Sequence, residues 1–194
     1  MREFNKLLSE IRNCSVCEDF LPLGPNPVIR ASESARLRIV GQAPGVRVHN
    51  TGIPFNDPSG DRLREWLGMD NKTFYNEELI AIIPMGFCYP GTGKNGDLPP
   101  RKECSELYFE RLAEHLKNIK LTILIGRYSQ EYFLGKRRKK NLSETVKNYR
   151  EYLPEYFPLP HPSPRNRGWF KSNSWFENEV IPELKQILIQ LEIR

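Results

Sequence analysis

Four short apolar runs rich in β-branched residues recur along the chain, at Leu37–Val40, Leu79–Ile83, Leu121–Ile125 and Tyr156–Leu159. Each run is nearly continuous in apolar character, which is typical of a strand whose sheet is covered on both faces. The pattern therefore predicts four strands at the centre of the fold.

Segments of helical period separate these runs. Asp57 is the expected N-cap of one helix, with Pro58 at its first position and Gly68 at its end. A second helix is expected to carry an apolar face of Leu107, Tyr108, Leu112 and Leu116. A third is expected to bury Val180, Ile181, Leu184, Ile187, Leu188 and Leu191. The alternation predicts one three-layer αβα domain over residues 1–194, with a central, mostly parallel four-stranded sheet.

In such folds ligands bind at the carboxyl ends of the strands, which draws attention to the loops after Val40 and Leu159. The first loop, Gly-Gln-Ala-Pro-Gly at residues 41–45, is a tight turn with exposed N–H groups, suited to an anion or an electron-rich ring. In the last loop prolines flank His161, and a rigidly held histidine suits a catalytic hydrogen-bond donor. Taken alone, the first loop also fits an ordinary strand-to-loop turn, and a lone histidine is more often a structural or exposed residue. A third segment, Tyr89–Pro100, is expected to be a long ordered loop of the kind that often carries function.

Taken together, the loops resemble a known family. Gly-Gln-Ala-Pro-Gly (41–45), Thr-Gly-Ile-Pro-Phe (51–55) and His-Pro-Ser-Pro-Arg-Asn (161–166) are similar, in this order, to the signature motifs of the uracil-DNA glycosylases. The first two look like those of the thermophile-type, iron–sulfur-containing branch. The Arg-Asn extension of the last resembles the single-strand-selective branch.

The resemblance implies roles for individual residues. Phe55 would stack on a base flipped out of the DNA, His161 would stabilise negative charge on the departing base, and Arg165 would fill the gap left in the duplex. The remaining base-binding residues would be Gly41, Ala43, Pro44 and Gly45, and the remaining DNA-binding residues Ser163, Asn166, Arg167 and Lys171. Core packing is the alternative for Phe55, and a phosphate contact or plain surface charge for Arg165.

The chain also departs from the family. Gln42 stands where the iron–sulfur branch has Glu, and Ala43 where the best-known uracil-specific branch has a water-activating Asp. Gln42 cannot act as a base, so its expected catalytic role is at most to orient a water. Pro84 and Met85 stand where other members place the Asn that reads the edge of uracil.

Three other residues could replace the missing acid or base, namely His49, Asp57 and Asp61. For the two aspartates, helix capping and placement in the first helical turn is the competing interpretation.

Four cysteines, Cys14, Cys17, Cys88 and Cys104, begin with a Cys-x-x-Cys pair. Four thiolates can hold a [4Fe–4S] cluster or a structural zinc ion, and free thiols are the third possibility. The spacing resembles that of the iron–sulfur branch, which implies a [4Fe–4S] cluster that cross-links the N-terminal segment to the loop after the second strand.

The formal net charge of +5 and the isoelectric point near 9.0 are compatible with a polyanionic partner such as DNA. The basic run Lys136–Lys140 fits a phosphate contact and a solvated loop equally well. Arg167, Trp169 and Lys171 follow the His161 loop and are the better candidates for DNA contact. No apolar run approaches the roughly 20 residues of a membrane span, so a cytoplasmic monomer without a membrane partner is expected.

Three functions follow from these observations. The first is a DNA glycosylase that hydrolyses the N-glycosidic bond of uracil or a related deaminated base, favoured by His161 together with Phe55. The second is a non-catalytic module of the same fold that binds damaged or single-stranded DNA, favoured by Gln42 and Ala43. The third is a nucleotide-handling α/β enzyme with a zinc site.

Overall fold

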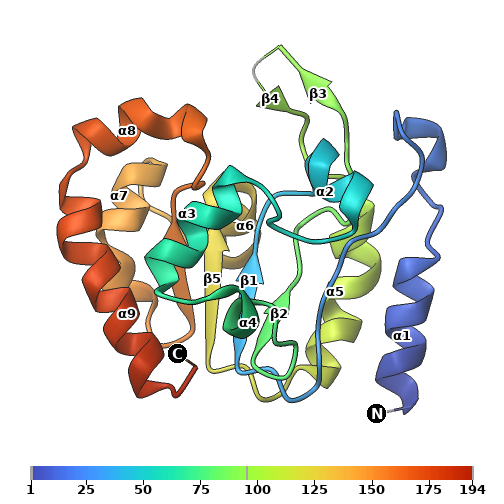
Figure 1. Cartoon of the computed structure of the whole chain (residues 1–194), viewed down its shortest axis with the longest axis horizontal. Helices are drawn as coiled ribbons and strands as arrows, with labels where there is room; N and C mark the ends of the chain where they lie inside the picture. Colours follow the sequence, from blue (N-terminus) through green and yellow to red (C-terminus); the bar gives the residue numbers. More distant parts are fainter. Residues whose placement is uncertain (1, 95, 194) are drawn as a thin grey trace.

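A four-stranded sheet with helices on both faces forms the centre of the computed structural model, which describes residues 2–94 and 96–193 (Figure 1). Its strands are β1 (Leu37–Val40), β2 (Ile80–Ile82), β5 (Leu121–Ile125) and β6 (Tyr156–Leu159). They lie in the order β2-β1-β5-β6, and every neighbouring pair is parallel. The predicted α/β fold is confirmed, and its central sheet is wholly parallel.

Helices connect the strands across both faces. The α-helices are α1 (Arg2–Arg12), α2 (Val46–Thr51), α3 (Pro58–Leu67), α4 (Asn71–Phe74), α5 (Glu103–His115), α6 (Gly126–Leu134), α7 (Leu142–Lys147), α8 (Arg167–Ser172) and α9 (Ile181–Gln190). Tighter 3-10 turns lie at Glu18–Phe20, Gly135–Arg137, Tyr149–Tyr152 and Pro164–Asn166, and a π turn, Phe176–Val180, leads into α9. Within residues 2–94 and 96–193, no helix is long and apolar enough to cross a membrane.

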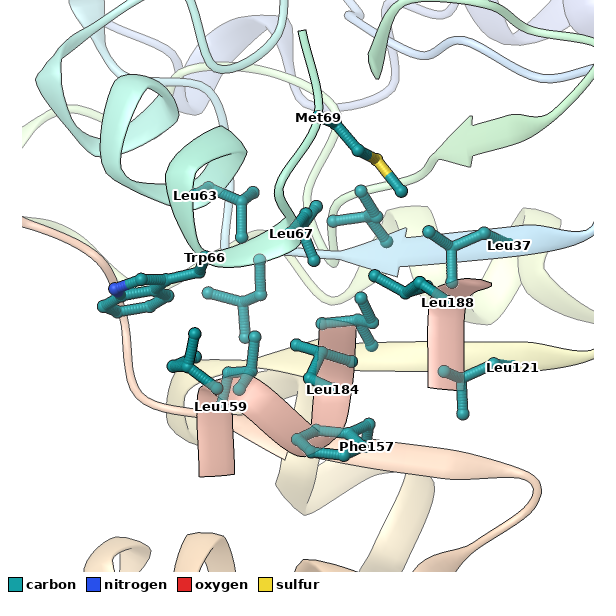
Figure 2. Close-up of a cluster of buried hydrophobic side chains, with 14 of the residues drawn as sticks. Leu37, Leu63, Trp66, Leu67, Met69, Leu121, Phe157, Leu159, Leu184 and Leu188 are labelled. Atoms are coloured by element: carbon teal, nitrogen blue, oxygen red, sulfur yellow. The ribbon is translucent and has the colours of Figure 1, made fainter. Parts of the chain in front are cut away.

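Alternation of side chains along the strands produces two cores, one on each face of the sheet. Leu37 and Ile39 of β1 pack in one core with residues of α3 and α9, whereas Val40 packs in the other with residues of α1 and α5. Figure 2 shows the first core, in which α3 and α9 lie against side chains of β1, β5 and β6. Both faces of the sheet are therefore buried, as the continuous apolar runs predicted.

Helix α3 forms as its local sequence predicts. The Asp57 side chain accepts a 2.9 Å hydrogen bond from the Gly60 N–H, and Pro58 occupies the first helical position. Gly68 ends the helix in the left-handed conformation, with φ of 64°. These local signals fix both ends of α3, whose N-terminal end lines the pocket described below.

Two details of the predicted elements were wrong. The second strand spans Ile80–Ile82 and is shorter than the apolar run Leu79–Ile83. In α5 the buried face follows Tyr108, Leu112 and Leu116, whereas the side chain of Leu107 is 45% exposed. The three buried residues are four positions apart and share one face of a helix, while Leu107 lies about 100° away from Tyr108 around the axis.

The segment Tyr89–Pro100 contains a small antiparallel hairpin, β3 (Thr92–Gly93) paired with β4 (Gly96–Asp97). Figure 1 shows it standing above the end of the sheet from which the β1 loop and α2 emerge. The Leu98 N–H donates to the Gly91 carbonyl over 2.8 Å and closes the base of the hairpin. The expected long loop is thus an ordered projection over the carboxyl edge of the sheet.

Two leucines of α5 give a matched test of the corrected helix face. Truncating Leu112, which is 1% exposed, should lower the free energy of unfolding by about 2–5 kcal/mol because it leaves a cavity in the core. Truncating Leu107 should change it by no more than about 0.5 kcal/mol. Urea unfolding of Leu112→Ala and Leu107→Ala measures both values. Equal losses would mean that α5 is rotated from the orientation described.

Candidate functional site

A pocket of about 530 Å³ opens at the carboxyl edge of the sheet. Its walls come from the loop after β1, the loop after β6, the start of α3 and the β3–β4 hairpin. The lining residues include 41–45, Pro54, Phe55, Asp57, Pro84, Gly96, Asp97, His161 and 163–166. The two loops singled out in the sequence therefore meet in one cavity.

His161 is held at the end of β6 by its own loop. Its Nδ1 atom accepts a 3.2 Å hydrogen bond from the Ser163 N–H, and its carbonyl accepts a 2.8 Å bond from the Asn166 side-chain amide. An Nδ1 atom that accepts must be unprotonated, so the neutral imidazole carries its proton on Nε2. Burial lowers the pKa of His161, and the charges of Asp57 and Asp97 oppose that shift. The pocket thus holds a neutral histidine with one N–H to donate.

Phe55 also lines the pocket, and its backbone conformation is strained. Its φ of 54° lies in the left-handed region, which bulky side chains rarely adopt and which costs on the order of 1 kcal/mol. The Arg64 guanidinium donates to the Phe55 carbonyl over 3.2 Å, and the Tyr75 hydroxyl donates to the Pro54 carbonyl over 2.9 Å. These two hydrogen bonds stabilise a turn that directs the aromatic ring at the pocket.

Two glycines let other segments approach Phe55. A Cβ atom at Gly60 would lie 1.7 Å from the Phe55 carbonyl oxygen, so only glycine allows α3 to pack against this backbone. A Cβ atom at Gly41 would lie 3.2 Å from Cζ of the Phe55 ring. The ring is therefore fixed between the start of α3 and the first residue of the β1 loop.

Gln42 connects the β1 loop to the hairpin. The side-chain amide of Gln42 donates a 3.0 Å hydrogen bond to the Leu98 carbonyl. The backbone carbonyl of Gln42 accepts a 2.9 Å hydrogen bond from the Gly86 N–H. The side chain thereby anchors the hairpin over the loop. A glutamate at this position could not donate this hydrogen bond.

Asp97 is a charged pocket residue that the sequence prediction missed. It lines the mouth of the cavity, and its negative charge raises the pKa of His161. The available signal was a carboxylate directly after Gly96, whose φ of 125° suits glycine, in a loop already expected to be ordered. No local pattern in the sequence indicates that the hairpin folds back onto the Gly41–Gly45 turn.

The structure separates the three candidate replacement acids and bases. Asp57 lines the pocket and also caps α3. Asp61 is an exposed residue of the first turn of α3 that pairs with Arg64 over 2.6 Å, and His49 lies outside the lining residues. Only Asp57 of the three is placed to act in the pocket.

The predicted DNA-binding residues form the rim beside His161. Ser163, Arg165 and Asn166 line the pocket, while Arg167 and Lys171 are exposed on the adjoining helix α8. Arg165 lies against the hairpin, because a Cβ atom at Gly96 would come within 2.7 Å of its Nη1 atom.

Trp169 has a mainly structural environment. Its indole N–H donates to the Ser143 hydroxyl over 2.7 Å, and its ring packs against Phe170, Trp175 and Phe176. Its packing therefore gives it a role in holding α8 in place.

The basic run Lys136–Lys140 is largely paired with carboxylates. Its ion pairs are Arg137 with Glu155, Arg138 with Glu131, and Lys139 with Glu151. Glu155 immediately precedes β6, whereas the His161 loop follows this strand, so Arg137 lies at the opposite end of β6 from the pocket. These contacts favour the solvated-loop interpretation over a phosphate-binding surface.

The four cysteines come from three segments of the chain, and none of them forms a disulfide. Burial raises the pKa of Cys88 to about 11 and that of Cys104 to about 12, and the charges of the other thiols add to both shifts. The Phe87 N–H donates to the Cys104 sulfur over 3.4 Å. In the part of the chain that the structure describes, no three or more His, Cys, Asp or Glu residues are grouped so as to hold a metal ion.

Comparison with known proteins places this pocket in a family. A model of the uracil DNA glycosylase superfamily matches residues 30–185, which is most of the chain. The protein belongs to the uracil DNA glycosylase superfamily. Among solved structures it is similar to a candidate uracil DNA glycosylase from Methanosarcina acetivorans, determined by NMR in solution, with 18% identity, 81% of this chain and 93% of that chain covered, and a TM-score of 0.46.

In this member of the uracil DNA glycosylase superfamily, three of the four substituted positions line the cavity. Gln42, Ala43 and Pro84 line the pocket, while Met85 is buried beside it. Pro84 offers no side-chain donor or acceptor.

The close approach of α3 to Phe55 can be tested with two glycines. Gly60→Ala should lower the free energy of unfolding by about 1–3 kcal/mol, because the new methyl group must displace the Phe55 backbone. Gly168→Ala, in α8, is the matched control: its Cβ atom meets nothing within 4 Å, and stability should stay the same or rise slightly. Thermal and urea unfolding of both variants provide the measurement. A Gly60→Ala protein as stable as wild type would contradict the described packing.

Proposed function

We propose that this protein is a monofunctional DNA glycosylase that hydrolyses the N-glycosidic bond of a flipped-out deaminated base. The observation that carries the proposal is the neutral His161, which keeps an Nε2–H to donate and lines the same pocket as Phe55. Superfamily membership supports DNA as the partner. The pocket of about 530 Å³ is large enough for a single base.

The chemistry asks for these two side chains. Cleavage of the bond leaves positive character on the sugar and an anionic base. Phe55 would stack on the base and hold it in place. The N–H of His161 would stabilise negative charge on an oxygen or nitrogen of the departing base. A desolvated site strengthens such a hydrogen bond.

The base preference is inferred from Pro84, which lines the pocket at a position where other members of the family place an Asn. Pro84 supplies no amide that would read the edge of uracil. We therefore propose that selectivity for uracil is imperfect and extends to related deaminated bases such as hypoxanthine and xanthine.

A second function, non-catalytic recognition of damaged or single-stranded DNA, is favoured by one contact. The Gln42 amide is engaged with the Leu98 carbonyl, and neither Gln42 nor Ala43 can accept a proton from water. Single-turnover kinetics separate the two functions.

Replacement of His161 tests catalysis directly. On oligonucleotides carrying uracil, hypoxanthine or xanthine, His161→Ala should reduce the cleavage rate by about 100- to 1,000-fold while leaving DNA affinity nearly intact. Gln42→Ala should cost less. Single-turnover formation of abasic product, on single- and double-stranded substrates, gives the rates. Tight DNA binding without product from any wild-type reaction would instead support the non-catalytic function.

We propose that DNA lies on the rim formed by Arg165, Arg167 and Lys171. Reversing these three charges should weaken DNA binding and flatten its salt dependence. Reversing Lys136, Arg137 and Lys140 is the comparison and should have the smaller effect, since Arg137 is already paired with Glu155. Fluorescence anisotropy at several salt concentrations measures both, and the reverse ranking would show that the DNA surface is misplaced.

We further propose that the chain belongs to the iron–sulfur branch and holds a [4Fe–4S] cluster on Cys14, Cys17, Cys88 and Cys104. In addition to burial, the charges of Cys14, Cys17 and Cys88 raise the pKa of Cys104, which indicates that the four thiols lie near one another, and the Phe87 N–H donates to the Cys104 sulfur. Four thiolates are a donor set that suits such a cluster. When bound, the cluster would cross-link three segments. Structural zinc is the alternative occupant.

Purification distinguishes these states of the cysteines. Anaerobically prepared protein should be brown and contain iron and sulfide, and Cys104→Ser should lose both. Zinc in place of iron would support the alternative site. Colourless protein without either metal, and with four titratable thiols, would exclude a metal centre.

A further inference from the structure

The proposed hydrolysis needs a group that accepts a proton from water, and the first motif supplies none. Two carboxylates line the pocket among the described residues, those of Asp57 and Asp97. Both are close enough to His161 for their charges to raise its pKa. They differ in how they are held.

Asp97 is positioned by a relay of hydroxyl groups on the hairpin. The Thr92 hydroxyl donates to Asp97 Oδ1 over 3.2 Å, and the Tyr89 hydroxyl lies 2.6 Å from that of Thr92. Because Thr92 donates its proton to Asp97, Tyr89 is the donor to Thr92. The hydrogen bond to Thr92 engages Oδ1 alone, and none of the described residues donates to the other oxygen, Oδ2.

The free oxygen lies over the turn that lacks an acid. A Cβ atom placed on Gly45 would be 3.6 Å from Asp97 Oδ2. The carboxylate thus lies against Gly45, the last residue of the Gly41–Gly45 turn, and lines the same pocket as Gln42 and Ala43. Asp57 likewise commits one oxygen, Oδ1, but to the backbone N–H of Gly60, so its carboxylate is tied to the start of α3.

Gln42 holds the hairpin in this position. Its amide donates to the carbonyl of Leu98, the residue directly after Asp97. A glutamate at position 42 would set a carboxylate against that carbonyl and lose the contact. The glutamine and the aspartate therefore form a matched pair.

We propose that Asp97 is the catalytic carboxylate that orients and deprotonates the attacking water, and that Gln42 is the positioning residue that holds it there. This assignment rests on the proposed glycosylase function. The base departs with the electron pair of the bond between the sugar C1′ atom and its nitrogen. The water oxygen bonds to C1′, the proton of the water passes to Asp97, and the departing base accepts a hydrogen bond from His161.

Isosteric replacement tests Asp97. Asp97→Asn should slow single-turnover cleavage by about 100-fold or more, since general-base catalysis typically contributes that much. DNA affinity should be retained or slightly raised, because one negative charge is lost. Glu65→Gln, an exposed carboxylate on α3 outside the pocket, is the control and should leave the rate unchanged. Added formate should restore part of the activity of Asp97→Ala, which a purely structural aspartate would not allow.

Gln42 is tested by a double-mutant cycle. Gln42→Glu should slow wild-type cleavage by roughly 10-fold and have little further effect in the Asp97→Asn background, because both changes remove one function. If Gln42 is merely structural, Gln42→Glu should slow cleavage by the same factor in the wild type and in the Asp97→Asn variant. A Gln42→Glu enzyme that is faster than wild type would indicate that residue 42, and not Asp97, holds the water. Either result overturns the pairing.

The outcomes separate this inference from the proposed function. Cleavage by wild type that persists in Asp97→Asn, or that is lost in Asp57→Asn instead, overturns the assignment of Asp97 and leaves the glycosylase function standing. The Asp57→Asn variant keeps a good helix cap, so a loss there is not a folding effect. Absence of product from wild type with every base overturns both.

Discussion

The pocket depends on the spacing of two strands that do not touch. Its two signature loops leave β1 and β6, which are separated by β5, and two strand spacings amount to about 10 Å. Strand β5 passes directly into α6 at Gly126, whose φ of 80° favours glycine. A Cβ atom added at this position would lie 3.8 Å from the Cβ atom of His161. Gln130 of α6 donates to the Leu159 carbonyl over 2.9 Å and holds the end of β6. The distance between the loops is therefore set by the sheet.

A second constraint acts across this gap. The strained turn at Phe55 persists because α3, whose start is fixed by the Asp57 cap, presses Gly60 against its backbone. The helix is anchored in turn by the core that it shares with α9 and the sheet (Figure 2). The strain at the site is thus offset by apolar burial away from it, and loosening that core would release the aromatic ring.

The sequence predicted features that are encoded locally. Strand runs covered on both faces, and α3 with its Asp57, Pro58 and Gly68 signals, each depend on a few adjacent residues, and both lie where expected. Leu107 was misplaced because its exposure depends on how α5 rotates against the sheet. His161 and Phe55, from the loops after β6 and β1, line one pocket. This agrees with the expectation that ligands bind at the carboxyl ends of parallel strands. Asp97 was missed because its position depends on the contact between Gln42 and Leu98, which are 56 residues apart.

The β3–β4 hairpin connects the cysteines to the pocket, because it lies between Cys88 and Cys104 in the chain and supplies Asp97 to the pocket lining. Most of its described residues, including Thr92, Lys94, Asp97 and Leu98, are exposed, so it buries little apolar surface of its own. Its position depends on polar contacts with Gln42, on the approach of Arg165 to Gly96, and on its two ends. Those ends lead to Cys88 and Cys104, both buried in the core. Burial of these two cysteines fixes both ends of the hairpin, so a change at Cys88 or Cys104 would reach the pocket through Asp97 without touching His161 or Phe55.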